Sequence, residues 1–68
     1  MKIRIDNPSN GRFTVYTPAE LARDARHVAR VNKAKMVEWF VSFNGDQVSL
    51  VVYLRGRDGW VGSHSQAI

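Results

Sequence analysis

One dipeptide constrains the fold of this chain more than any other feature. Asn44-Gly45 lies between two runs that are rich in β-branched and aromatic residues. Such a dipeptide is the strongest short-range signal for a β-hairpin with a type I′ turn. Placing Asn44 and Gly45 at the tip gives one apolar face of three cross-strand pairs: Val41 with Val48, Trp39 with Leu50, and Val37 with Val52. We expect this face in the core, where Trp39→Ala costs about 3–5 kcal/mol.

The amino-terminal residues predict a second hairpin. Residues 2–6 and 12–17 alternate between polar and apolar side chains, and residues 7–11 between them are almost all turn formers. When Asp6 is paired with Arg12, one face becomes wholly apolar, with Ile5 opposite Phe13 and Ile3 opposite Val15. A shift of one residue would destroy this match, so the alternation predicts this register.

A helix is expected between the two hairpins. Thr17-Pro18-Ala19-Glu20 has the residue types of a capping box, with proline at the first helical position. The helix is expected to run from about Pro18 to about Val31 or a few residues further, and Asn32 is the residue expected to leave it in the left-handed conformation. Its apolar side is formed by Leu21, Ala25 and Val28. The opposite side carries four cationic residues and one histidine: Arg23, Arg26, His27, Arg30 and Lys33.

The carboxyl-terminal segment carries the weakest signals. Gly56-Arg57-Asp58-Gly59 predicts a turn that leads into a short strand at Trp60-Val61. A loop of two or four residues puts Trp60 on the face of Tyr53 and Arg55, whereas a three-residue loop with a bulge reverses it. Residues 63–68 carry no structural signal and are expected to fray. The element order is therefore β-β-α-β-β-β, an α+β fold in which one antiparallel sheet packs a single amphipathic helix on one face.

Length and composition restrict the function classes. Sixty-eight residues make one domain, 1–68, with no space for a separate catalytic unit. The chain has no cysteine, its two histidines are far apart in the sequence, and its carboxylates are scattered, so we expect no metal site and no cofactor. No apolar run approaches the roughly 20 residues of a membrane span. We expect a soluble cytoplasmic protein that makes no membrane contact.

The charge distribution suggests one partner-binding surface. The chain has a net charge of +4, and residues 23–35 account for all of it, with five basic residues against Asp24. Such a concentration is typical of a protein that meets phosphates or clustered carboxylates. The alternative is structural, because basic residues late in a helix complement its dipole and an outer helix face is polar in any case. The candidate residues are Arg23, Arg26, His27, Arg30 and Lys33.

The reverse face of the long hairpin suggests a second surface. It carries residue types that are enriched in protein interfaces, namely Met36, Phe40, Tyr53, Arg55 and Trp60. This face is open to several interpretations: a homodimer contact, a contact with another protein, or a platform on which single-stranded nucleic acid stacks. It is also open to being covered within the monomer by the first hairpin or the tail.

These surfaces favour binding over catalysis. The leading hypothesis is a non-enzymatic protein that inhibits or modulates a host protein or nucleoprotein complex with an acidic surface. In size and composition the chain resembles small accessory proteins of phages and mobile elements, many of which act by stoichiometric binding. The alternative is a small nucleic-acid-binding regulator that uses the basic helix. A distant third is a small RNase-like toxin that pairs His27 with Arg23 or Arg30.

Overall fold

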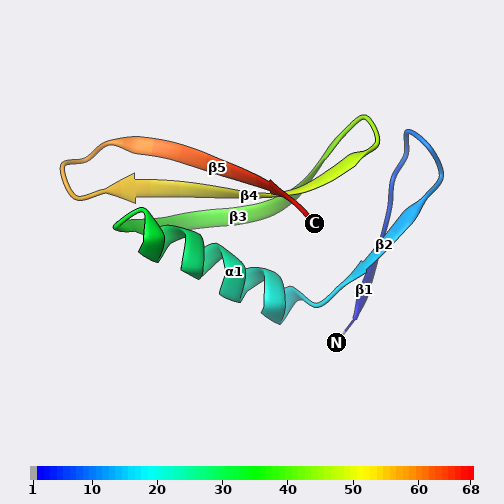
Figure 1. The fold of residues 1–68 in the computed structure, drawn as a ribbon, viewed down its shortest axis with the longest axis horizontal. Coiled ribbons are helices and arrows are strands. Elements are labelled where there is room, and N and C mark those ends of the chain that lie inside the picture. The colour runs from blue at the N-terminus through cyan, green and yellow to red at the C-terminus, as the bar shows by residue number, and fades with distance from the viewer. Residues whose placement is uncertain (1) are drawn as a thin grey trace.

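The computed structural model describes residues 2–68, so Met1 of the predicted domain lies outside the described residues. The elements are β1 (Ile3–Asp6), β2 (Phe13–Tyr16), α1 (Pro18–Val31), β3 (Ala34–Asn44), β4 (Gln47–Gly56) and β5 (Val61–Ala67). The predicted α+β class and element order are confirmed. The prediction of a single sheet is wrong, because β1 and β2 form their own two-stranded sheet beside a three-stranded sheet of order β3-β4-β5 (Figure 1).

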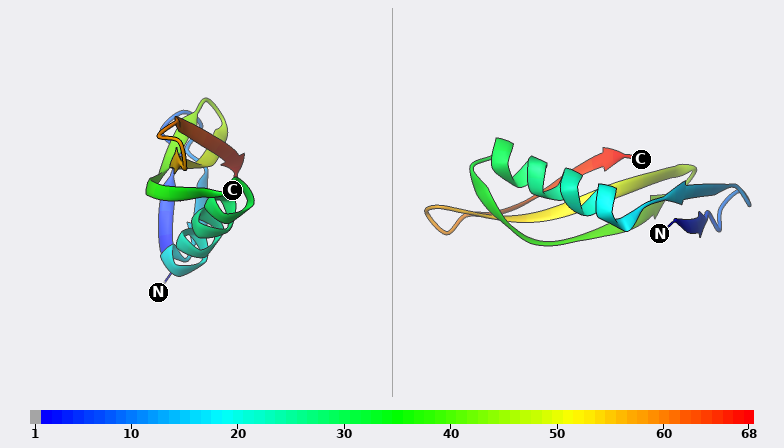
Figure 2. Two further views of the ribbon diagram at one scale, coloured as in Figure 1. Left: turned by 90° about the vertical axis from the view of Figure 1, so that its left-hand side faces the viewer. Right: turned by 90° about the horizontal axis from the view of Figure 1, so that it is seen from below.

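The core lies between α1 and the three-stranded sheet. The helix packs against β3 and β4, which Figure 2 shows from two further directions. The predicted apolar helix face is confirmed, and the central strand β4 supplies the opposite wall. The buried apolar residues are Leu21, Ala25, Val28 and Ala29 from the helix and Leu50, Val52 and Leu54 from β4.

The β3–β4 hairpin forms as expected, with a different turn. Its tip is Gly45-Asp46, because Asn44 pairs with Gln47 across the turn. Gly45 has a φ of 61°, the positive value that a type II′ turn requires at its first central position. The predicted pairs are therefore wrong by two residues, and Trp39 faces Val52 instead of Leu50. Since strand side chains alternate with a period of two, this shift leaves the two predicted faces intact.

A β-bulge changes the faces at the start of β3. The register shifts between Met36 and Glu38, so Val37 has no partner and is 57% exposed. Met36 turns inward, pairs with Leu54 and packs against the core. The prediction that Val37 is a core residue is wrong, and so is the placement of Met36 on the outer sheet face. An extra residue in one strand reverses the alternation beyond it.

The loop between β4 and β5 also reverses a predicted face. The amide of Gly56 donates to the carbonyl of Trp60 at 2.8 Å, which closes a three-residue loop with Gly59 at a φ of 82°. Trp60 thereby lies on the helix side of the sheet. A Cβ built on Gly56 would overlap its indole, and one on Gly62 would approach the ring at 3.1 Å. The predicted position of Trp60 beside Tyr53 is therefore wrong.

The expectation of a frayed tail is wrong. Residues 61–67 form β5, which pairs with β4 from Val61 opposite Arg55 to Ala67 opposite Ser49. The sequence of this segment is polar and has low β-propensity, so its own residues do not indicate a strand. The strand exists because β4 presents a full row of hydrogen-bonding groups to it.

The β1–β2 register is shifted by one residue from the predicted one. Asn7 joins the hairpin: its amide donates to the carbonyl of Arg12 at 2.7 Å, and its side chain accepts a bond from the amide of Ser9. Asp6 therefore pairs with Phe13 instead of Arg12. As a result Phe13 lies on the outer face and is 56% exposed, so the prediction that it packs beside Ile5 is wrong.

The helix has the predicted bounds, but the interactions that cap its two ends differ from the predicted ones. Thr17 is the N-cap residue, and its side chain makes no cap hydrogen bond, so the capping-box prediction is wrong on this point. At the other end the Asn32 side chain donates to the carbonyl of Val28 at 2.8 Å. The left-handed residue is Lys33, with a φ of 53°, and not Asn32.

The molecule is elongated for its length. Its principal extents are 42 × 25 × 14 Å and its radius of gyration is 13.0 Å, against about 11 Å expected for a compact chain of this size. The described part of the chain contains no helix that is both long and apolar enough to cross a membrane.

Candidate functional site

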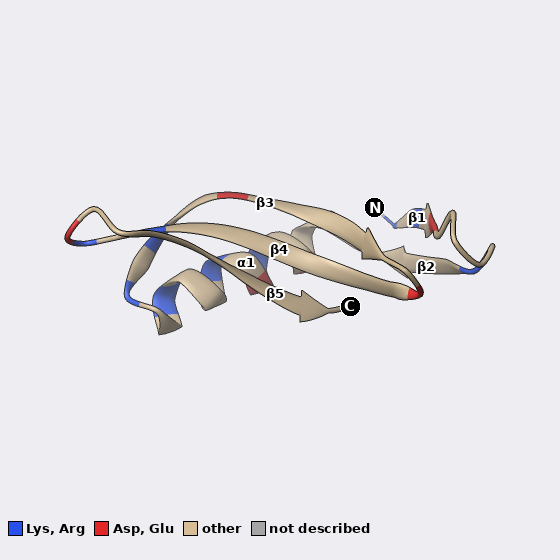
Figure 3. Cartoon of the chain, turned by 90° about the horizontal axis from the view of Figure 1, so that it is seen from above, with Lys and Arg blue, Asp and Glu red and all other residues tan. Residues whose placement is uncertain are grey.

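Four basic residues meet where α1 ends, β3 begins and β4 ends. We call this group, Lys33, Lys35, Arg55 and Arg57, the basic end. All four side chains are exposed. Figure 3 shows the Lys and Arg positions gathered at this end of the cartoon, with further basic positions along α1. The two segments that contribute them are about 20 residues apart in the sequence, and the β3–β4 hairpin brings them together.

The helix exit positions the first two of these residues. The Asn32 and Lys33 amides donate to the carbonyls of Val28 and Arg30, which stops the helix within one turn. The left-handed conformation of Lys33 then redirects the chain into β3. Lys35 follows as the second residue of β3 and stands opposite Arg55 across the hairpin.

The other two residues flank the last residue of β4. Arg55 and Arg57 lie on either side of Gly56, which is buried beneath the indole of Trp60. Arg57 is the first residue of the three-residue loop. Because Gly56 carries no side chain, the indole of Trp60 can lie over the strand at this position. Arg57 follows directly and borders the same hollow as Lys33 and Lys35.

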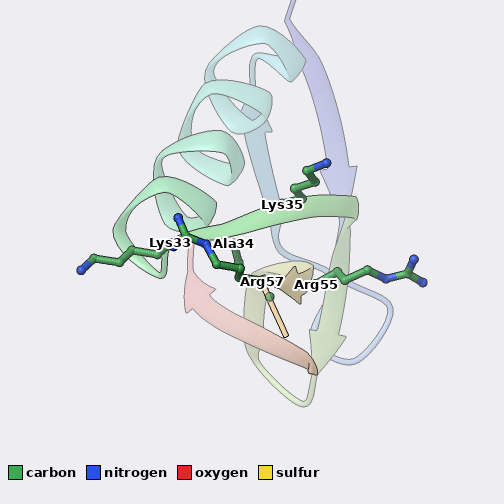
Figure 4. Close-up of a pocket in the computed structure, with 6 residues that line it drawn as sticks. Lys33, Ala34, Lys35, Arg55 and Arg57 are labelled. Atoms are coloured by element: carbon green, nitrogen blue, oxygen red, sulfur yellow. The ribbon is translucent and has the colours of Figure 1, made fainter. Parts of the chain in front are cut away.

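These residues border a hollow of about 460 Å³, which also includes Ala34 and Gly56. Its volume is within the range of small-molecule sites, roughly 300–1,000 Å³. Figure 4 shows Lys35 and Arg55 extending to one side of the hollow and Lys33 and Arg57 to the other. The hollow is therefore open to solvent and surrounded by positive charge, which suits an anionic group at a surface more than a small molecule enclosed in a pocket.

Within residues 2–68 no ion pair neutralises the charges of the basic end. Among residues 2–68 the only ion pair joins Arg4 to Asp6, with Nε and Oδ1 2.9 Å apart, and both belong to the distant β1. Lys35 and Arg55 face each other directly, and like charges at opposed positions of a sheet destabilise it. Asp58 is the single acidic residue within the loop that follows Arg57. This end of the hairpin therefore carries an excess of positive charge.

The basic residues predicted on the helix extend this surface. Arg23, Arg26, His27 and Arg30 are all exposed, and the helix turns its opposite side to the sheet. Arg30 lies in the last helical turn, one turn before Lys33. The predicted stripe is therefore accessible along its whole length and joins the basic end at Lys33. Whether these residues bind a partner stays a prediction.

The predicted aromatic surface is smaller in the structure. Phe40 and Tyr53 remain on the outer sheet face, with ring centroids 5.4 Å apart and planes tilted by 54°. Arg55 lies two residues further along β4 on the same face, which places it next to the ring pair and within the basic end. Met36 and Trp60 belong to the opposite side. The structure thus joins the remaining aromatic pair and the basic end into one continuous surface.

The histidines do not come together with other candidate ligands. His27 is exposed on α1 and His64 is exposed on β5. Within the described residues no three His, Cys, Asp or Glu side chains are close enough to hold a metal ion.

Sequence reasoning missed the basic end as a unit. Lys35 belongs to the basic segment 23–35, whereas Arg57 lies outside that segment. The signal was present in two spacings, Lys33-x-Lys35 and Arg55-x-Arg57, at either end of the predicted hairpin. The predicted register placed Lys35 opposite Leu54, and only the shifted register brings it opposite Arg55.

Comparison of this chain with protein-family models, curated proteins and solved structures found no significant match.

Proposed function

We propose that this protein is a non-enzymatic binding protein that modulates a nucleoprotein complex and contacts clustered phosphates of that complex through its basic end. One observation carries the proposal: four exposed cations from two distant segments surround one hollow with no ion-pair partner among the described residues. An uncompensated group of this kind is the expected footprint of a polyanionic partner.

The residue types at this end suit phosphate contacts. The guanidinium groups of Arg55 and Arg57 can each donate two parallel hydrogen bonds to one phosphate or carboxylate. The ammonium groups of Lys33 and Lys35 add positive charge without demanding one geometry. Arg26 and Arg30 on α1 extend the contact along the outer surface of the helix. A partner bound there would have its own surface covered, which is how a small stoichiometric inhibitor acts.

A second candidate function is direct binding of single-stranded nucleic acid. The observation that favours it is the position of the Phe40–Tyr53 ring pair next to Arg55 on the open sheet face. Bases stack on such rings while cations hold the phosphates of the same strand. In this case the sheet face joins the basic helix as a contact surface, and the protein acts as a small nucleic-acid-binding regulator.

The salt dependence of binding tests the proposal. Four phosphate contacts predict that affinity for the captured complex falls about 100-fold between 50 and 200 mM salt. The immobilised protein is first used to capture its partner from a lysate of the organism that encodes it, with and without nuclease. The captured complex is then titrated over the salt series.

Three outcomes separate the alternatives. The proposal expects a steep salt dependence and a complex that contains both protein and nucleic acid. A steep dependence that is reproduced by a purified single-stranded oligonucleotide alone supports the second candidate and contradicts the first. An affinity that changes by less than about threefold over the same range contradicts phosphate binding altogether.

A further inference from the structure

The outer edge of β5 is an open row of hydrogen-bonding groups. In an antiparallel strand, alternate residues direct both their N–H and C=O groups to one neighbour. Trp60 and Ile68 flank β5, and both bond to residues on the β4 side: the amide of Gly56 donates to the carbonyl of Trp60, and the amide of Ile68 donates to the carbonyl of Val48 at 2.9 Å. The even-numbered residues of β5 therefore bond to β4. The odd-numbered residues therefore direct their backbone groups away from the sheet: Val61, Ser63, Ser65 and Ala67.

This edge lacks the features that protect exposed strands. Natural proteins guard such edges with lysine, proline, inward-pointing charges or a bulge. Residues 61–67 contain no charged residue and no proline, and their pairing with β4 has no register shift. The other edge of the same sheet, β3, is interrupted by the bulge at Val37 and carries Lys35 and Glu38. Only the β5 edge is left regular and uncharged over its length.

The β5 edge is also complementary to itself. Two copies of the strand can lie antiparallel about a two-fold axis through His64. Val61 then meets Ala67 of the second copy, and Ser63 meets Ser65 of the second copy. All four outward-facing residues are paired in this register, whereas a shift by two residues in either direction leaves one of them unpaired on each copy. Ser63 and Ser65 have small side chains, so the opposed serines of the two copies fit side by side on one face of the joint sheet.

We propose that a second copy of this chain pairs along β5, giving a six-stranded antiparallel sheet with His64 at its two-fold axis. The charges permit this arrangement. Each copy has a net charge of +4, and the antiparallel pairing sends the two basic ends to opposite ends of the joint sheet. The sheet order β3-β4-β5 makes β5 the edge strand at which the copy joins. Figure 3 shows α1 crossing beneath β5 on one face of the sheet, so the helix does not lie in the row of the strands. This inference does not depend on the proposed function.

Disulfide cross-linking tests both the interface and its register, because the chain has no cysteine of its own. His64 and its copy form a non-hydrogen-bonded pair with Cα atoms about 4.5 Å apart, within the range that a disulfide spans. The copies of Gln66 are four residues apart along the strand, about 13 Å, which a disulfide cannot span. Mild oxidation is therefore expected to cross-link His64→Cys and to leave the matched control Gln66→Cys monomeric on a denaturing gel.

Solution mass provides the second measurement. By light scattering the unmodified protein is expected at twice its 7.7 kDa mass. Ser65→Pro removes an outward-facing N–H without removing a bond to β4, so it should be monomeric with an unchanged circular dichroism spectrum. Ser65→Ala keeps the N–H and should remain dimeric.

Three results would overturn the inference: a monomeric parent protein, equal cross-linking of the two cysteine variants, or a folded Ser65→Pro variant that still dimerises. If Ser65→Pro fails to fold, the cysteine pair still decides the question. The first of these results includes a parent protein that is monomeric alone and forms its edge contact only with another protein.

Discussion

Removal of residues 63–68 is expected to unfold this protein. These residues form most of β5, whose even-numbered positions supply the hydrogen bonds on one side of the central strand β4. Each such bond contributes about 0.5–1.5 kcal/mol, and a domain of this length has a total stability of roughly 3–10 kcal/mol. The loss of one whole strand therefore consumes most or all of the stability.

Circular dichroism and urea denaturation of the truncated chain give the measurement. The matched control is the double variant Ser63→Ala with Ser65→Ala, which changes two side chains in the same segment and keeps every backbone bond. We expect the control to unfold at nearly the parental urea concentration. If the truncated chain instead keeps the parental unfolding free energy, residues 63–68 are a frayed tail and the strand assignment is wrong.

Leu50→Ala is expected to destabilise the protein strongly. Leu50 is 1% exposed at the centre of β4, where it contributes to the core against α1. Truncation of a buried leucine to alanine costs about 2–5 kcal/mol, because the cavity that remains is only partly refilled. This is comparable with the total stability of so small a domain. The free energy of unfolding in urea measures the loss.

Val37→Ala is the informative control. Sequence alternation places Val37 in the core, whereas the bulge leaves it 57% exposed. The structure therefore predicts a change within about 0.5 kcal/mol, as for other surface substitutions. If Val37→Ala proves as damaging as Leu50→Ala, the bulge is absent and the simple alternation holds to the start of β3.

The sequence predicted the faces of the elements better than their registers. The period of 3.6 placed Leu21, Ala25 and Val28 in the core, and the period of two placed Leu50 and Val52 there. Both patterns are properties of one segment and do not depend on which residue of a neighbouring strand lies opposite. Registers depend on turns. The turn lies at Gly45-Asp46, one residue later than the predicted Asn44-Gly45, and this shifts the pairs between the turn and the bulge by two residues.

Single-residue irregularities account for most of the remaining errors. The bulge at Val37 moved Met36 inward, and the three-residue loop before Trp60 moved that ring to the helix side. Neither leaves a clear signal in the local sequence, because both arise from how two strands fit together. β5 was missed for a related reason: its sequence favours no structure, and its pairing with β4 determines its conformation.

In the candidate site, too, the features of a single segment could be predicted, and those that depend on strand pairing could not. The basic stripe on α1 could be predicted, because it depends on helical periodicity alone. The basic end could not, because it needs the correct β3–β4 register to place Lys35 opposite Arg55. It also needs the left-handed Lys33 that turns the chain from α1 into β3.

The measurement that tests the basic end most directly is a comparison of charge reversals at equal net charge. Arg55→Glu with Arg57→Glu changes the net charge from +4 to 0, and so does Lys2→Glu with Arg12→Glu on the distant first hairpin. Arg26→Glu with Arg30→Glu makes the same change on α1. Affinity for the captured partner is measured for all three at one salt concentration.

Loss of the phosphate contacts of two cations predicts an affinity at least about tenfold lower for the Arg55/Arg57 variant, with a shallower salt dependence. The Arg26/Arg30 variant is expected to weaken binding to a smaller extent, and the Lys2/Arg12 control is expected to bind within about threefold of the parent. If the control loses as much affinity as the Arg55/Arg57 variant, binding responds to net charge alone and the basic end is not the contact site.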